Sequence, residues 1–193
     1  MKIFFSASLL GDFPQEIIRK IYHEIEALGF EHTDNEAVTL SKEEFIRLKE
    51  LPHEDRIRRY NEKMDAIKKA DICVFDASAH SLSTGFLVHA SLDHMKPTIV
   101  LYYKDLVPYF MAGIENERLI IRGYDEKTLK KMIREVITLA REKRDKRFNF
   151  FISPKLLEFL ERASAEEGIT KSKYIRNLIV EHMRSNKNSK NTE

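Results

Sequence analysis

The sequence has one cysteine and no apolar run that approaches the length of a membrane span. The lone Cys73 excludes a disulfide framework within the chain, and its place in an apolar segment predicts an inert, buried thiol. Residues 1–5 already show a strand-like pattern, without the charged and apolar regions of a secretory leader. We therefore expect a cytoplasmic protein with no membrane partner.

Several signatures of chemistry are also missing. The sequence contains no Walker or dinucleotide-binding fingerprint, and no Ser-His-Asp arrangement can be read from its spacing. His89 and His94 are five residues apart and do not share a helix face. We predict no metal site and no cofactor.

Charge is unevenly distributed along the 193 residues. Hydrophobic residues make up 42% of the chain, enough for a core, and the net charge is only +2. Residues 141–193 nevertheless carry 13 Lys and Arg against 8 Asp and Glu, whereas residues 1–140 carry 20 against 23. The C-terminal end is therefore the part expected to meet nucleic acid, if any part does.

Residues 70–102 are the stretch around which the first part of the chain is organised. A short β-branched and aromatic run ends at Asp76, a polar turn at 81–85 leads into a helical pattern, and a second apolar run follows Pro97. This order is typical of a βαβ unit in a parallel sheet. With the other alternating strand and helix patterns, it predicts an α/β, flavodoxin-like, doubly wound parallel sheet.

The predicted domain organisation has four parts. Residues 1–140 form the α/β domain, 141–147 a basic linker, 148–184 a small second domain and 185–193 a polar, disordered tail. In the second domain, alternation at 148, 150 and 152 predicts a strand, Ser153 and Thr170 are helix caps, and Gly168 ends the first helix. One strand and two short helices cannot bury their own apolar face, so a second copy is the expected partner.

The pattern at about 146–184 resembles the ribbon-helix-helix family, of the MetJ and Arc type. That resemblance implies a β-α-α dimerisation module whose paired strands enter the DNA major groove. The residues at the matching strand positions are Arg147, Asn149 and Phe151, and Thr170, Lys171 and Ser172 match the helix start that holds a DNA phosphate. The alternative is a dimerisation module that binds no DNA.

About 1–125 resembles the nucleoside 2-deoxyribosyltransferases and the related deoxynucleoside monophosphate N-glycosidases. The matching features are the strand at 3–8, Tyr60 with Asn61, the strand at 70–75, and the run 81–86 followed by Lys96 and Pro97. The resemblance implies a flavodoxin-like, dimeric protein that cleaves or exchanges the N-glycosidic bond of a deoxynucleoside or its 5′-phosphate.

Three positions depart from the residues that this chemistry requires. Leu87 stands at the position of the catalytic glutamate, Lys63 at that of an aspartate, and Phe4 at that of an aromatic hydroxyl. Losing a nucleophile removes several orders of magnitude of rate. Asp76, Glu62 and Asp65 are then the remaining candidates for catalytic carboxylates.

The ligand-binding positions match the resembled family better than the catalytic positions do. Hydroxyls and backbone amides ahead of a helix suit a 5′-phosphate, although they also serve as ordinary helix caps. Asp76 ends the central strand and is expected to face the pocket. The predicted ligand-binding residues are Ser8, Gly11, Asp76, Ser81, Ser83, Thr84 and Gly85.

These observations favour a homodimer that binds a nucleotide or nucleoside and that has lost its catalytic carboxylates, with DNA as a possible second partner. It would be a ligand-sensing regulator. The alternative is an active N-glycosidase or deoxyribosyltransferase that the C-terminal module merely dimerises. A third reading is a structural dimer without a ligand.

Overall fold

A computed structural model of the chain describes residues 1–9, 13–143 and 150–190. It divides into two compact units, Met1–Asp145 and Lys146–Glu193, and each is described by itself. Gly11, Arg147 and Asn149, which the sequence assigns to binding sites, lie outside the described residues.

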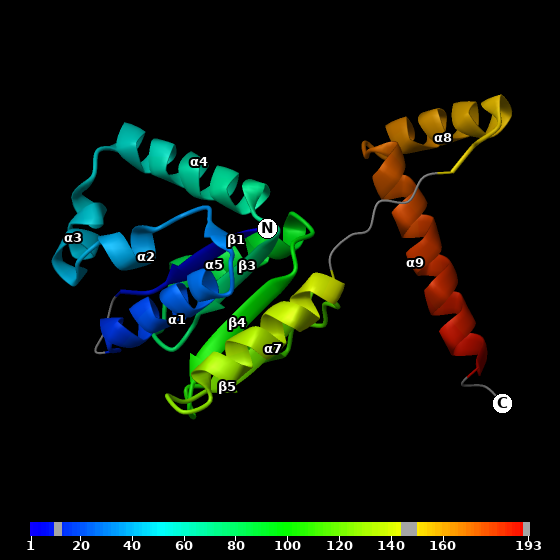
Figure 1. Cartoon of the computed structure of the whole chain (residues 1–193). Coiled ribbons are helices and arrows are strands. Elements are labelled where there is room, and N and C mark those ends of the chain that lie inside the picture. The colour runs from blue at the N-terminus through cyan, green and yellow to red at the C-terminus, as the bar shows by residue number, and fades with distance from the viewer. Residues whose placement is uncertain (10–12, 144–149, 191–193) are drawn as a thin grey trace. The chain divides into compact units, whose positions relative to one another are not determined.

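The N-terminal unit is built on a five-stranded parallel sheet (Figure 1). Its order β2-β1-β3-β4-β5 is that of a flavodoxin-like, doubly wound fold, as predicted. The strands are β1 (Lys2–Ala7), β2 (Glu31–His32), β3 (Ile72–Asp76), β4 (Thr98–Tyr103) and β5 (Leu119–Tyr124). Every residue of β3 is buried, because a central parallel strand is covered by helices on both faces.

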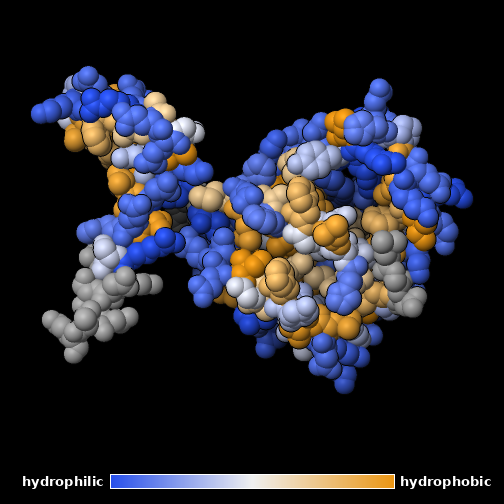
Figure 2. Space-filling model, turned by 180° about the vertical axis from the view of Figure 1, so that it is seen from behind, coloured by the Kyte–Doolittle hydropathy of each residue, from blue (hydrophilic) through white to orange (hydrophobic). Residues whose placement is uncertain are grey.

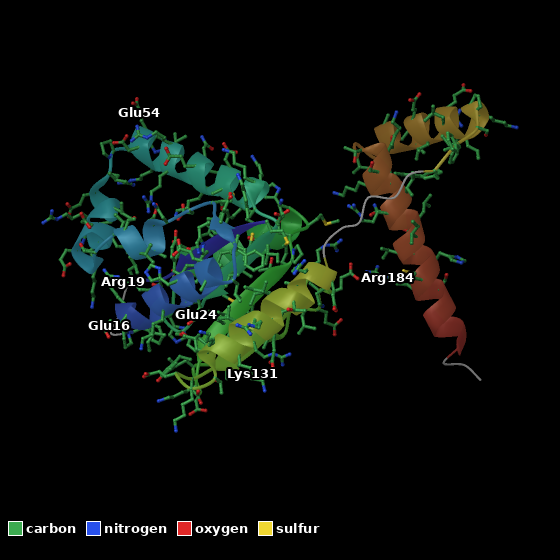
Figure 3. The ribbon with its side chains drawn as sticks, in the orientation of Figure 1. Glu16, Arg19, Glu24, Glu54, Lys131 and Arg184 are labelled. Carbon is green, nitrogen blue, oxygen red and sulfur yellow. The ribbon has the colours of Figure 1, made fainter. Side chains whose placement is uncertain are left out.

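Helices cover both faces of the sheet. On one face, α1 (Gln15–Ala27) and α7 (Leu129–Glu142) pack on side chains such as Ile3, Phe5 and Val74. On the other, α4 (His53–Lys69) and α5 (Leu82–Asp93) pack on Phe4 and Phe75. The outer sides of the helices are charged: Figure 3 shows Glu16 and Arg19 of α1 and Lys131 of α7 on the surface.

The sheet has its topological switch point between β1 and β3. The chain leaves β1 for α1 on one face and leaves β3 for α5 on the opposite face. Ligands of open α/β sheets bind beside the carboxyl ends of the strands at such a point.

Short elements connect β2 to α4 and β4 to β5. They are α2 (Glu36–Thr39), α3 (Lys42–Arg47), the 3-10 turn η1 (Leu48–Glu50) and α6 (Tyr109–Ala112). Ser41 and Glu44 form a capping box at the start of α3. The 3-10 turn η1 follows α3 directly.

The C-terminal unit consists of α8 (Pro154–Glu166) and α9 (Lys171–Lys190). Pro154 lies at the first position of α8, where its missing N–H costs nothing. Gly168 has φ +64°, a left-handed conformation that suits the residue ending a helix.

Two expectations for this unit differ from the structure. Residues 150–152, the described part of the predicted strand, are not in a strand, since such a ribbon needs a second chain to pair with. The tail predicted to be disordered from 185 is helical as far as Lys190, because no glycine or proline interrupts α9. Residues 191–193 lie outside the described part.

Within the described ranges, no helix has both the length and the apolar character needed to cross a membrane.

A buried carboxylate closes the carboxyl end of β3. Asp76 is 1% exposed, and its two oxygens accept hydrogen bonds from the Tyr124 hydroxyl at 2.6 Å and the Ser78 backbone N–H at 3.0 Å. The Ser78 hydroxyl in turn accepts from the Tyr103 N–H. Burial raises the pKa of Asp76, although the bonds from Tyr124 and Ser78 oppose that shift.

This raised pKa predicts a pH-dependent stability. From the ordinary value of about 3.9 up to the raised pKa, the folded chain holds a proton that the unfolded chain has released. The contribution of Asp76 to the free energy of unfolding is therefore largest below about pH 3.9. It declines as the pH rises from there to the raised pKa. Asp76→Asn cannot ionise. Its amide oxygen can still accept from the Ser78 N–H, and its amide nitrogen can donate to the Tyr124 hydroxyl oxygen, so that bond reverses direction. Urea unfolding at pH 4 to 8 should therefore show the variant at least as stable as wild type at neutral pH.

Asp76→Ala is the control for the hydrogen bonds, since it leaves Tyr124 and Ser78 unpaired and should cost about 2 kcal/mol at every pH. A loss in Asp76→Asn as large as that in Asp76→Ala at pH 7 would show that the ionised carboxylate is required.

Candidate functional site

A cavity of about 860 Å³ opens at the switch point, on the α4 and α5 side of the sheet. Its floor includes Ser6, Ala7 and Ser8 at the carboxyl end of β1. One wall is the start of α5, and the facing wall consists of α2, α3, η1 and α4. A volume of this size accommodates a small organic ligand.

Hydroxyl groups gather where α5 begins. Ser81, Ser83 and Thr84 line the cavity with Ser8. The Ser81 hydroxyl caps the helix by accepting a hydrogen bond from the Thr84 N–H at 3.2 Å. Thr84 is 4% exposed, and its own hydroxyl has no hydrogen-bond partner among the described residues. The positive end of the helix dipole, together with a hydroxyl that is free to donate a hydrogen bond, suits an anion.

One face of α4 forms much of the opposite wall. Arg56, Arg59, Tyr60, Lys63 and Met64 recur at three- and four-residue spacing, so their side chains share this face and line the cavity. Arg56 donates to the carbonyls of residues 51 and 49, at 2.7 and 3.2 Å, and thereby braces η1 against α4.

An ion-pair cluster joins α4 to the chain that follows β2. The Lys63 ammonium lies 2.8 Å from Asp34 and 2.9 Å from Glu36, and Arg59 also pairs with Glu36. The four side chains are between 13% and 29% exposed, so water screens them less than it screens surface pairs. Two carboxylates thus balance two cations at this wall.

Apolar side chains complete the cavity. Tyr60 and Phe86 form a tilted aromatic pair with ring centroids 6.0 Å apart, and each is about half exposed. Such rings offer flat surfaces against which a planar group can stack. The other apolar lining residues are Phe45, Ile46, Leu48, Leu51, Met64, Leu82 and Leu87.

The structure brings together Ser8, Ser81, Ser83 and Thr84 from the predicted ligand-binding set. Gly85 does not line the cavity; a Cβ there would lie 3.6 Å from the Met111 Cε.

The three carboxylates predicted as weak catalytic candidates lie elsewhere. Asp76 shares its strand parity with Val74, which faces α1 and α7, so it points to the face of the sheet opposite the cavity. Glu62 and Asp65 are exposed on other faces of α4, where they lie near Arg58 and Lys68. The expectation that Asp76 faces the pocket fails because side chains alternate along a strand.

Two of the three departures from the resembled family occur within the cavity. Leu87 and Lys63, which replace a glutamate and an aspartate of that family, both line it. Phe4 is fully buried, with the Lys63 ammonium 5.8 Å from its ring centroid.

Sequence reasoning missed Glu36, Asp34 and Arg59. Glu36 is the one acidic side chain among the described residues of the cavity wall. The available signal was the helical spacing of Arg56, Arg59 and Lys63, which places three cations beside the apolar edge of α4.

In the C-terminal unit, the described residues of the predicted DNA site are exposed. Phe151 is fully exposed, and the Thr170 hydroxyl accepts from the Lys173 N–H at 3.3 Å, as a helix cap does. The Lys171 ammonium lies 2.7 Å from a Glu161 carboxylate oxygen, and Ser172 is exposed.

No group of three or more His, Cys, Asp or Glu side chains suited to a metal ion occurs in the described part of the chain. Cys73 is buried as predicted, and burial raises the pKa of its thiol to about 12.

Comparison with known proteins yields structural likeness only. No family model matches the chain, and no curated protein sequence matches it. The CMP N-glycosidase BcmB of Clostridium botulinum is similar at 15% identity and a TM-score of 0.46, over 71% of this chain and 99% of that one. A de novo designed Rossmann 2x3 fold protein is similar at 12% identity and a TM-score of 0.43, over 79% and 98%. Likeness at this level does not assign the chain to a family.

The ion-pair cluster predicts a large effect of Lys63→Met on stability. The substitution leaves Asp34 and Glu36 largely buried with one cation fewer, which should lower the free energy of unfolding by about 2–3 kcal/mol. Lys68→Met is the matched control on the same helix, because its pair with Asp65 is more than half exposed and contributes at most about 1 kcal/mol. Urea unfolding of both variants tests this, and equal losses would contradict it.

Proposed function

We propose that the N-terminal unit binds a nucleotide. The phosphate would lie at the start of α5, and the base would lie against the apolar side chains of the cavity, which include Tyr60 and Phe86. The observation that carries this proposal is Thr84, a residue 4% exposed whose hydroxyl has no hydrogen-bond partner among the described residues, at a helix N-terminus that lines the cavity. A phosphate oxygen there would accept a hydrogen bond from Thr84 and from backbone N–H groups of the first turn.

Three cations of the facing wall are already engaged. Arg56 is bound to backbone carbonyls, and Arg59 and Lys63 are paired with carboxylates. Lys49 also lines the cavity, but it is exposed, so water screens its charge. A phosphate placed there would have to displace Glu36 or Asp34, or lie against them. The start of α5 has no carboxylate beside it among the residues lining the cavity.

We further propose that the protein is a regulator rather than a catalyst. Leu87 and Lys63 stand where the resembled family carries carboxylates, and Glu36 is held by two cations. Ion pairing stabilises the anionic carboxylate and lowers its nucleophilicity.

The C-terminal unit would then dimerise the protein and bind DNA. Several of its apolar side chains are exposed, and Figure 2 shows orange apolar patches among the hydrophilic residues of its surface. A unit of two helices leaves them uncovered, and a second copy paired through residues 148–152 would bury them. Those at least 38% exposed are Phe150, Phe151, Leu156, Leu157, Phe159, Leu178, Ile179, Val180 and Met183.

An active N-glycosidase is the second candidate, and Glu36 is the observation that favours it. Its carboxylate is the one acidic group of the described cavity lining and could approach a sugar carbon there. Release of free base from deoxynucleoside or nucleoside monophosphates, lost in Glu36→Gln, would support this candidate and exclude the regulator.

Nucleotide binding predicts a selective effect of Thr84→Val. The variant keeps the shape of the side chain and removes one donor to the phosphate, so affinity for a nucleoside monophosphate should fall about tenfold. Affinity for the matching nucleoside should not change. Isothermal titration with AMP, GMP, CMP, UMP and their nucleosides measures both.

Ser91→Ala is the control for Thr84→Val. It removes another buried hydroxyl from α5, one that donates to the Leu87 carbonyl and does not line the cavity. Equal weakening of nucleotide and nucleoside by Thr84→Val would place the phosphate elsewhere, and absence of binding by all eight compounds would remove the proposal.

DNA binding predicts that Arg147→Ala with Asn149→Ala weakens binding to random-sequence duplex DNA and flattens its salt dependence, because a cation at the DNA surface is lost. Lys131→Ala, which removes an exposed cation from α7, should leave DNA binding unchanged. A salt series by fluorescence anisotropy tests the two together.

The same proposal requires a dimer. In sedimentation velocity, the wild type should be a dimer and Ile179→Glu a monomer, and Ile179→Glu should also abolish DNA binding. Glu181→Gln on the same helix should remain a dimer and still bind DNA. DNA binding that is absent at low salt, or unchanged by the Arg147 and Asn149 substitutions, would contradict the regulator.

A further inference from the structure

The cavity reaches past both edges of β1. In the sheet β1 lies between β2 and β3, so one end of the cavity abuts the β3–α5 connection and the other the chain after β2. The first end carries Ser81, Ser83 and Thr84, and the second carries Glu36. A ligand lying across the carboxyl end of β1 would meet a different chemistry at each end.

The Glu36 end suits a neutral donor. Asp34 and Glu36 together balance Arg59 and Lys63, so these two cations add little net attraction for an anion beside Glu36. A carboxylate has about four lone-pair sites, and two cations leave some of them available. Glu36 faces the cavity and is 19% exposed in its side chain, so O–H groups of a ligand can reach it.

Hydroxyls of a sugar are donors of this kind. In nucleotide-binding α/β folds, an acidic side chain near the end of the second strand accepts a hydrogen bond from the ribose. Glu36 lies four residues after β2, which ends at His32. The cations also hold Glu36 in place, so little side-chain entropy remains to be lost when a ligand binds.

We propose that Glu36 selects ribonucleotides, by accepting hydrogen bonds from the 2′- and 3′-hydroxyls of a ribonucleoside monophosphate. This inference rests on the proposed function and deepens it, since it names the sugar. The phosphate lies at the start of α5, the sugar edge at Glu36, and the base against the apolar wall that includes Tyr60 and Phe86. A sugar without these hydroxyls leaves the carboxylate partly desolvated and short of donors, which disfavours its binding.

The test compares AMP, GMP, CMP and UMP with their 2′,3′-dideoxy counterparts by isothermal titration against the full chain. For the base that binds best, wild type should prefer the ribose form by at least about tenfold. Glu36→Gln should reduce that preference to less than about threefold while it still binds the dideoxy form, because loss of the carboxylate affects only the hydroxyl contacts.

Asp34→Asn is the matched control. Asp34 contacts the same Lys63 ammonium and does not line the cavity, and the asparagine oxygen can still accept from the Glu36 N–H. The ribose preference should therefore survive in Asp34→Asn. Its loss there as well would assign the effect to the ion pairs and overturn the inference.

Comparing the affinities of the wild-type protein for ribose and dideoxy nucleotides tests the selection of ribonucleotides without any variant. Equal affinity for ribose and dideoxy forms removes the role of Glu36 and leaves nucleotide binding intact. Absence of binding by every nucleotide removes the proposed function itself.

Discussion

The order of the strands is the constraint on which the rest of this structure depends. Because β1 and β3 are neighbours whose following helices lie on opposite faces, a crevice is left beside the carboxyl end of β1 on the α4 and α5 side. The cavity occupies that place. The alternation of side chains along the same strands assigns Ser6 and Ser8 to the cavity and the buried Asp76 to the opposite face of the sheet.

Ion pairing then determines what the cavity can hold. Its wall carries more cations than carboxylates, which would suggest a basic, phosphate-binding site. Glu36 and Asp34 pair with Arg59 and Lys63, and backbone carbonyls occupy Arg56. At the opposite wall, the Thr84 hydroxyl has no hydrogen-bond partner within the described part of the chain. A ligand that is anionic at one end and carries hydroxyl groups at the other matches this placement of the Thr84 hydroxyl and the Glu36 carboxylate.

The fold could be predicted from sequence, and much of the site could not. Short apolar runs separated by helical patterns determine a parallel sheet, and Ser81 to Thr84 follow β3 directly, so their place at the cavity was predictable. Glu36 was missed because its position depends on a long-range tie to α4, which periodicity does not reveal. Asp76 was misjudged although parity with Val74 would have placed it correctly. The alternation at 148, 150 and 152 suggested a strand in the C-terminal unit, but the described residues 150–152 do not form one.

The central claim is that a nucleotide lies across the carboxyl end of β1 in one orientation. A crystal structure of the protein with the tightest-binding ribonucleoside monophosphate tests it most directly. We expect a phosphate oxygen within hydrogen-bond distance of the Thr84 hydroxyl and a ribose hydroxyl within hydrogen-bond distance of Glu36. A phosphate bound to Arg59 or Lys63, with Glu36 displaced, would contradict it, as would a nucleotide bound on the Asp76 face of the sheet.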